Sequence, residues 1–253
     1  MRSPAFLAAA TAALTTLAVG IPGGPAAREG TASAAYEEVA VGNGGSIAGV
    51  VRLPIPPVKE PDIRITKDES VCGTRIADES VVRDADGGLK SAVVHLEQIA
   101  RGKSIDKGAV VRVDTYQCRF EPHVLAMAVG QKLQIVNGDP ILHNPHARLS
   151  GVQDVFNIAL PVQNLKVTRV IREPGDLRVT CDDGHIWMLA WIHAFPHPYF
   201  AVTDAKGAFR IEEVPAGAYR LRAWHEALGT QVVEVSVSPG EETRVAFEKL
   251  SRK

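Results

Sequence analysis

The residues most able to do chemistry lie in the segment 181–188, which reads Cys-Asp-Asp-Gly-His-Ile-Trp-Met. Cys181, His185 and Met188 place a thiol, an imidazole and a thioether in one short loop, and His143 offers a second imidazole upstream. Thiolate and thioether are soft ligands and imidazole is intermediate, so this set with a weak axial methionine favours copper. Zinc is the competing metal, but a methionine suits it poorly as the fourth ligand. The residue types therefore predict a copper site.

Short runs in which apolar and polar residues alternate must position these ligands. Examples are residues 45–53, 131–136 and 231–237, which are separated by turns rich in Gly, Pro, Asn and Asp. The 22 Gly and 16 Pro of the 253 residues favour many turns over long helices. We therefore predict an all-β protein built from β-sandwiches.

From about residue 109 to residue 196, the order of landmarks resembles that of the cupredoxins, the blue-copper family that includes plastocyanin and amicyanin. The landmarks are the turn and strand at 129–133, Asn137, His143-Asn144, and a strand that leads into Cys181, His185 and Met188. The His-Asn-x-His pattern that begins at His143 is most similar to amicyanin. The loop differs from amicyanin because it has three residues between the cysteine and the histidine where amicyanin has two.

The resemblance implies a Greek-key sandwich with a type 1 copper site. His143, Cys181 and His185 would be the strong ligands, and Met188 the axial ligand. Asn144 would tie the two ligand loops together and donate its backbone N–H to the cysteine sulfur. Copper is thus the expected cofactor.

A second resemblance concerns the C-terminal region. The patterns Thr203-Asp204-x-x-Gly207 and 214–221 (VPAGAYRL) are similar to the second half of a carboxypeptidase-regulatory-like, transthyretin-type sandwich. Residues 45–51 and 92–96 fit the first half of such a sandwich but lie upstream of the cupredoxin-like region. We therefore expect the cupredoxin-like region to be nested inside a second β-sandwich.

The expected order of parts follows from these patterns. It is a signal peptide at 1–34, a flexible segment at 35–44, an N-terminal β region at 45–98, a cupredoxin domain at 109–196 and a C-terminal β region at 197–248.

The N-terminal segment predicts export. Residues 4–21 are apolar, follow Arg2, and lead to Thr31-Ala32-Ser33-Ala34, a cleavage site of the A-x-A type. An uncleaved N-terminal anchor is the alternative. We expect a periplasmic or extracellular protein. The formal net charge of −1 argues against a nucleic-acid partner.

The three cysteines allow three different pairings. The copper site that the resemblance implies needs Cys181 as a free thiolate, and an oxidising compartment favours disulfides. We therefore predict a disulfide between Cys72 and Cys118, with a bridge that includes Cys181 as the alternative.

The expected function is electron transfer by an exported type 1 copper protein that is not an enzyme. The chain also resembles bacterial proteins labelled as methylamine-utilisation proteins, which implies periplasmic electron transfer. We expect a redox partner protein whose identity this resemblance does not establish. The cupredoxin resemblance further implies that the electron leaves through the exposed edge of His185, and we expect Ile186, Trp187 and residues 140–142 to form an apolar docking patch around it. The alternative is that these apolar residues only seal the site from water. The alternatives are a copper carrier or sensor, and a carbohydrate- or protein-binding module. His146 is the alternative to His143 as a ligand.

Overall fold

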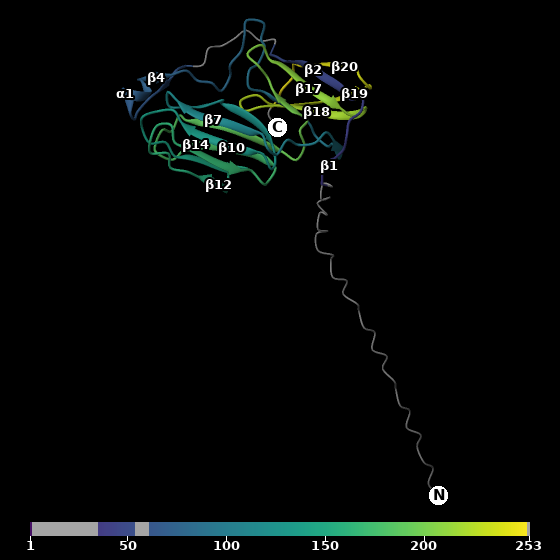
Figure 1. The fold of residues 1–253 in the computed structure, drawn as a ribbon, viewed down its shortest axis with the longest axis horizontal. Helices are drawn as coiled ribbons and strands as arrows, with labels where there is room; N and C mark the ends of the chain where they lie inside the picture. The colour runs from purple at the N-terminus through teal and green to yellow at the C-terminus, as the bar shows by residue number, and fades with distance from the viewer. Residues whose placement is uncertain (2–34, 54–60, 252–253) are drawn as a thin grey trace. The chain divides into compact units, whose positions relative to one another are not determined.

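The computed structural model describes residues 1, 35–53 and 61–251 of the chain. The regular structure of these residues is β-strand apart from one short helix, α1 (Glu69–Cys72), so the all-β prediction is confirmed (Figure 1). The predicted signal peptide lies outside the described residues except for Met1. Among the described residues, no helix is both long and apolar enough to span a bilayer.

The first sandwich is built entirely from residues 110–195 and has two sheets. One sheet has the strand order β13 (Lys166–Val170), β10 (Lys132–Asn137), β7 (Val110–Tyr116), β8 (Arg119–Glu121). The other has the order β12 (Gln153–Asn157), β11 (Pro145–Leu149), β14 (Gly175–Cys181), β15 (Leu189–Phe195), β9 (Val124–Ala128).

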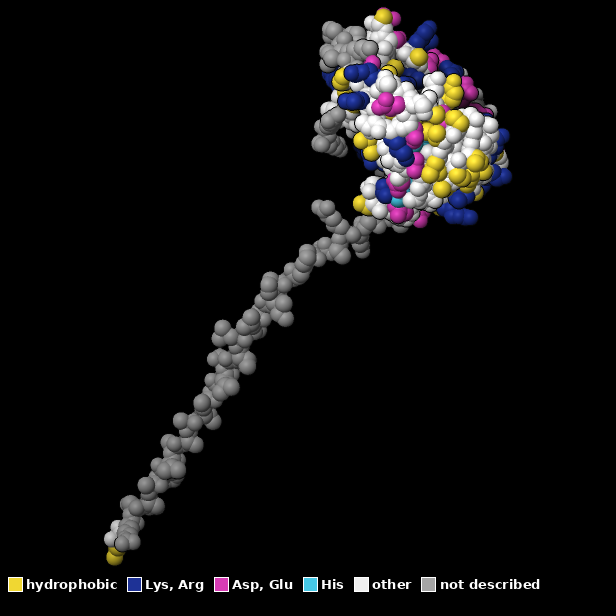
Figure 2. Space-filling model, turned by 90° about the vertical axis from the view of Figure 1, so that its left-hand side faces the viewer, with side chains coloured by type: hydrophobic (Ala, Val, Ile, Leu, Met, Phe, Trp, Pro, Cys, Tyr) yellow, Lys and Arg dark blue, Asp and Glu magenta, His cyan; other side chains and the backbone are white. Residues whose placement is uncertain are grey.

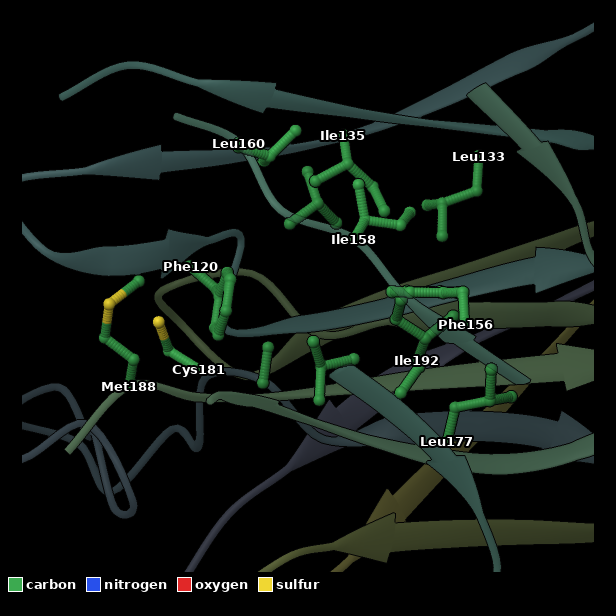
Figure 3. Close-up of a cluster of buried hydrophobic side chains, with 14 of the residues drawn as sticks. Phe120, Leu133, Ile135, Phe156, Ile158, Leu160, Leu177, Cys181, Met188 and Ile192 are labelled. Atoms are coloured by element: carbon green, nitrogen blue, oxygen red, sulfur yellow. The ribbon is translucent and has the colours of Figure 1, made fainter. Parts of the chain in front are cut away.

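The core of the first sandwich follows from the alternation of the strands, since every second residue points to the same face of a sheet. Leu133 and Ile135 of β10 and Leu177 and Ile192 of β14 and β15 are at most 2% exposed. Figure 3 shows these side chains in one cluster, with Cys181 at its edge. The loop 181–188, which contains three of the predicted ligands, is therefore attached to the buried core of this sandwich.

The second sandwich combines strands from both ends of the chain. Its first sheet has the order β16 (Phe200–Val202), β5 (Val93–Leu96), β18 (Gly217–His225), β19 (Gly229–Val237), and its second has the order β17 (Ala208–Val214), β2 (Gly45–Val51), β20 (Glu242–Phe247). Its core includes Ile47, Leu96, Tyr199, Leu221 and Phe247, which are fully buried. The first sandwich is thus inserted between β5 and β16, which is the nested arrangement that the sequence predicts.

Residues 35–44 differ from the expected flexible segment. β1 (Glu37–Glu38) pairs in parallel with β6 (Arg101–Gly102). The Tyr36 hydroxyl donates to the carbonyl of Lys103 at 2.6 Å, and its ring packs edge-on against Tyr199. This aromatic anchor fixes a segment whose composition alone indicates a linker.

A strap of residues 63–76 packs on the first sandwich although it precedes that sandwich in the chain. It consists of β3 (Ile63–Arg64), which pairs with β4 (Arg75–Ile76), and of α1 between them. Cys72 at the end of α1 forms a disulfide with Cys118, with 5.3 Å between the two Cα atoms. The predicted pairing is therefore present, and Cys181 is the free cysteine.

Charges of both signs are mixed on the face of the molecule that Figure 2 shows. The face in Figure 2 carries acidic and basic side chains interspersed, with apolar side chains gathered on one side. This pattern accords with the formal net charge of −1.

Candidate metal centre

The structure brings His143, Cys181 and His185 together. His143 lies in the loop between β10 and β11, Cys181 is the last residue of β14, and His185 lies in the loop that leads to β15. The Cys181 Sγ is 3.9 Å from the His143 Nδ1 and 3.5 Å from the His185 Nδ1. The two imidazoles are fully buried and the cysteine is 6% exposed. Three ligand atoms of the predicted types therefore face one another in a buried space.

The two ligand loops meet because β11 and β14 are antiparallel neighbours, with Pro145 opposite Cys181. The backbone N–H of Asn144 donates to the Cys181 Sγ at 3.3 Å. In return, the backbone N–H of Asp182 donates to the Asn144 carbonyl at 2.9 Å. Asn144 thus has the position that the resemblance implies, because its backbone joins both loops and supplies a hydrogen bond that stabilises a thiolate.

Met188 closes the same loop. Its backbone N–H donates to the His185 carbonyl at 2.9 Å, and its side chain is 1% exposed. Figure 3 shows Met188 and Cys181 at the same end of the buried cluster. The additional residue of the loop is accommodated at Gly184, whose φ of +86° lies in the region that glycine adopts without steric cost.

Each ligand histidine is held by a carboxylate on its far nitrogen. The Nε2 of His143 lies 2.9 Å from Asp139 Oδ2, and the Nε2 of His185 lies 2.9 Å from Asp68 Oδ2. Donation of an Nε2–H to a carboxylate leaves the Nδ1 lone pair free, and this is the usual arrangement of metal-binding histidines. The Nδ1 atoms of both histidines face the Cys181 sulfur.

The electrostatic environments of the two histidines differ. Burial lowers the pKa of His143, but the hydrogen bonds to Asp139 and Cys181 outweigh it and raise this pKa to about 9. Burial raises the pKa of Asp139, but hydrogen bonds from His143 and from the N–H groups of Cys118 and Gln117 hold it below its ordinary value. Burial dominates at His185 and lowers its pKa. His143 therefore holds a proton more tightly than His185 does.

His146, the alternative ligand, is not part of this group. Its Nε2 lies 2.7 Å from Asp154 and its Nδ1 lies 2.5 Å from Asp182. Both ring nitrogens are thus engaged by carboxylates, and His143 is the histidine that faces the sulfur.

The expectation of an exposed His185 edge is wrong. The imidazole is fully buried because Asp68 of the strap caps its Nε2. Asp139 is also buried, at 4% exposure, against His143. The exposed residue beside the ligand loop is Ile186, at 84%. Trp187 shapes the site from the other side, because its ring meets that of His185 edge-on at 5.4 Å.

The sequence interpretation did not assign either carboxylate a role at the histidines. Asp139 carries a local signal, since it precedes His143 by four residues in a tight loop. Asp68 carries none, because it lies 117 residues before His185.

The donor set fits copper. With metal–nitrogen and metal–sulfur bonds of about 2.0 and 2.3 Å at a tetrahedral angle, the nitrogen and the sulfur bound to one ion lie about 3.5 Å apart. The sulfur of Cys181 is 3.5 Å from the His185 Nδ1 and 3.9 Å from the His143 Nδ1, which is close to this separation. The buried thioether of Met188 beside the thiolate favours copper over zinc.

One family model matches part of the chain, from within β14 of the first sandwich to just after β20 of the second. Residues 178–249 match the model of the carboxypeptidase regulatory-like domain family. A search of curated protein sequences found no match.

Among solved structures, the purple cupredoxin from Nitrosopumilus maritimus is similar to 33% of this chain over 98% of its own, at 18% identity and a TM-score of 0.29. The reduced Cu(I) form of an amicyanin mutant with glycine in place of a proline is similar to 34% of this chain over 82% of its own, at 18% identity and a TM-score of 0.30. A copper-containing nitrite reductase from Thermus scotoductus SA-01 is similar at 23% identity and a TM-score of 0.30, over 36% of this chain and 23% of the reductase.

Proposed function

We propose that the protein is an exported type 1 copper protein that transfers electrons and is not an enzyme. The observation that carries the proposal is the buried Cys181 thiol, which the Nδ1 atoms of two histidines and a backbone N–H approach. Soft and intermediate donors of this kind suit both oxidation states of copper. The periplasmic or extracellular location rests on the N-terminal segment, and the link to methylamine utilisation stays a prediction.

The residues of this chain would have separate roles in holding copper. His143, Cys181 and His185 would supply the strong bonds and Met188 the weak axial one. Bound copper would supply a one-electron couple at this site. The hydrogen bonds to the histidines and to the sulfur keep the donors in place before and after electron transfer, so that little reorganisation accompanies it.

The redox partner is expected to dock at the exposed end of the ligand loops. Ile186 and Leu142 are 84% and 37% exposed and flank the ligands in sequence, whereas Ile141 is partly buried against the core. Transient redox contacts are small, and exposed apolar residues suit them. We expect Ile186→Lys to slow electron self-exchange between oxidised and reduced protein and to leave the absorption spectrum unchanged. An unchanged exchange rate would exclude this docking surface.

An absorption spectrum with one equivalent of Cu(II) tests the metal assignment. A thiolate-to-copper band near about 600 nm is expected for a site of this donor set. Cys181→Ser and His143→Gln should abolish the band. His146→Gln is the matched control, because His146 lies three residues along the chain and its nitrogens face carboxylates.

The outcomes separate the alternatives. Absence of the band, together with tight binding of Zn(II), would show a zinc protein. A band without reversible oxidation and reduction would favour a copper carrier or sensor. Retention of the band in Cys181→Ser would contradict the site itself.

A further inference from the structure

The carboxylate that caps His185 comes from outside the first sandwich. Asp68 lies in the strap, residues 63–76, and its Oδ2 is 2.9 Å from the His185 Nε2. Each ligand residue lies between positions 143 and 188, within the first sandwich. The environment of one ligand histidine is thus completed by a separate piece of the chain.

The strap is held firmly where it meets the site. Ile65 is fully buried and Ile76 is 6% exposed, and both belong to the core of the first sandwich. The Cys72–Cys118 disulfide fastens the end of α1 to that sandwich. Asp68 therefore lies on a fixed support only a few residues from a covalent attachment.

The side chain of Asp68 does not cap α1. Asp68 occupies the N-cap position of α1, where aspartate normally accepts a hydrogen bond from the first turn, but its side chain makes no such bond. Its φ of +53° lies in the left-handed region, which aspartate adopts more readily than most residues other than glycine. The carboxylate does not cap α1 and is thus available to the His185 imidazole.

Lys67 places a positive charge beside Asp68 and Asp183. The Lys67 ammonium donates to Asp183 Oδ2 at 2.6 Å and to the Asp183 carbonyl, and it lies 3.9 Å from Asp68 Oδ2. A protein cation thus occupies the space beside both acids. Asp68 is left with the His185 imidazole as its hydrogen-bond donor.

We propose that Asp68 is a positioning residue for His185. By accepting the Nε2–H, it holds the imidazole in the tautomer whose Nδ1 lone pair faces Cys181, and it shields the ring from water. Its negative charge also stabilises Cu(II) more than Cu(I), so it lowers the reduction potential. This inference rests on the proposed copper function and assigns it a residue beyond the four ligands.

Three variants of the full chain test the role. Asp68→Ala removes the acceptor and the charge, whereas Asp68→Asn removes the charge but keeps an amide oxygen that can accept. Glu69→Gln is the matched control, because it removes the same charge at the next, exposed position. The measurements are Cu(II) and Cu(I) affinity by competition titration, the reduction potential, and the His185 tautomer from nitrogen-15 NMR of the copper-free protein.

Asp68→Ala should bind Cu(II) about 10- to 100-fold more weakly, as is typical when the partner of a metal-binding histidine is lost. It should also lose the single His185 tautomer. The potential should rise by about 59 mV for each tenfold excess of the Cu(II) loss over the Cu(I) loss. Asp68→Asn should retain the tautomer and still raise the potential, and Glu69→Gln should change neither.

Equal behaviour of Asp68→Ala and Glu69→Gln would overturn the role of Asp68. If Asp68→Ala does not fold, Asp68→Asn decides, since an unchanged potential in that variant contradicts the charge effect. A wild-type protein that binds no copper would overturn the proposed function instead. The His185 tautomer in the copper-free protein then tests the positioning role separately.

Discussion

Acidification should lower the free energy of unfolding through His197, which is not one of the candidate metal ligands. His197 is 3% exposed, in the connection between β15 and β16. Its Nε2 donates to the Leu96 carbonyl at 2.9 Å, and its Nδ1 accepts the Tyr199 N–H at 3.2 Å. The second bond requires an unprotonated Nδ1, so this geometry fits only the neutral imidazole.

The magnitude follows from the pKa of this group. Burial, reinforced by the nearby His95, lowers the pKa of His197 from 6.5 to about 4. The unfolded chain therefore binds a proton on this histidine at a higher pH than the folded chain, and the free energy of unfolding falls as the pH falls from about 6.5 to 4. At about 1.4 kcal/mol for each tenfold change in proton affinity, His197 alone accounts for about 3 kcal/mol.

Urea unfolding of wild type and His197→Gln between about pH 8 and pH 4 measures this contribution. The glutamine amide can still donate to the Leu96 carbonyl but does not titrate. The advantage of wild type over the variant should shrink by about 3 kcal/mol across this range. A pH-independent difference between the two proteins would refute the reasoning.

His123 provides a control of opposite sign. Burial lowers its pKa, but its hydrogen bond with Glu226 outweighs burial and raises the pKa above the ordinary value. Its contribution to stability is therefore fully present below the unfolded pKa and is lost as the pH rises through the folded one. His123→Gln should cost most at acid pH, whereas His197→Gln should cost least there.

Three further outcomes are expected. Replacing both Cys72 and Cys118 by Ala, which opens a sequence separation of 46, should lower the free energy of unfolding in urea by about 3 to 4 kcal/mol; an unchanged midpoint would contradict the stabilising role of the bridge. Gly49→Ala should cost more than about 2 kcal/mol by thermal unfolding, because a Cβ there would lie 1.9 Å from a backbone oxygen of β20, whereas Gly42→Ala, with nothing within 4 Å, should cost little. Met188→Leu should keep the blue colour but raise the reduction potential measured by voltammetry, and loss of the band would show that the thioether is a strong ligand.

The grouping of the candidate ligands could be predicted from the sequence because their arrangement is largely local. Cys181, His185 and Met188 share one loop, and spacing within a loop limits where side chains can lie. His143 lies beside these residues because β11 pairs with β14, and the order of landmarks in the sequence already implies this pairing. The alternation of apolar residues similarly predicts both sandwiches, since the period of a strand is independent of what it pairs with.

The surroundings of the donors could not be predicted in the same way. Spacing has no information on a contact across 117 residues, and the strap that makes this contact precedes the first sandwich in the chain. Composition also gave the wrong expectation for residues 35–44, because the hydrogen bond from Tyr36 to Lys103 holds a segment that was expected to be flexible. Both differences arise from tertiary contacts that individual residues make far along the chain.

The strap leaves the second sandwich before the first sandwich begins. Residues 63–76 lie in the connection between β2 and β5, and they pack on the first sandwich beside the candidate metal site. The Cys72–Cys118 disulfide then links the strap to the end of β7 and β8, beside Asp139, whose carboxylate accepts the Cys118 N–H at 2.9 Å. The same connection thus lies near the carboxylates of both ligand histidines, Asp68 on one side and Asp139 on the other. A copper site that takes its donors and Asp139 from the first sandwich would accordingly take part of its orientation and shielding from the strap, which precedes that sandwich in the chain.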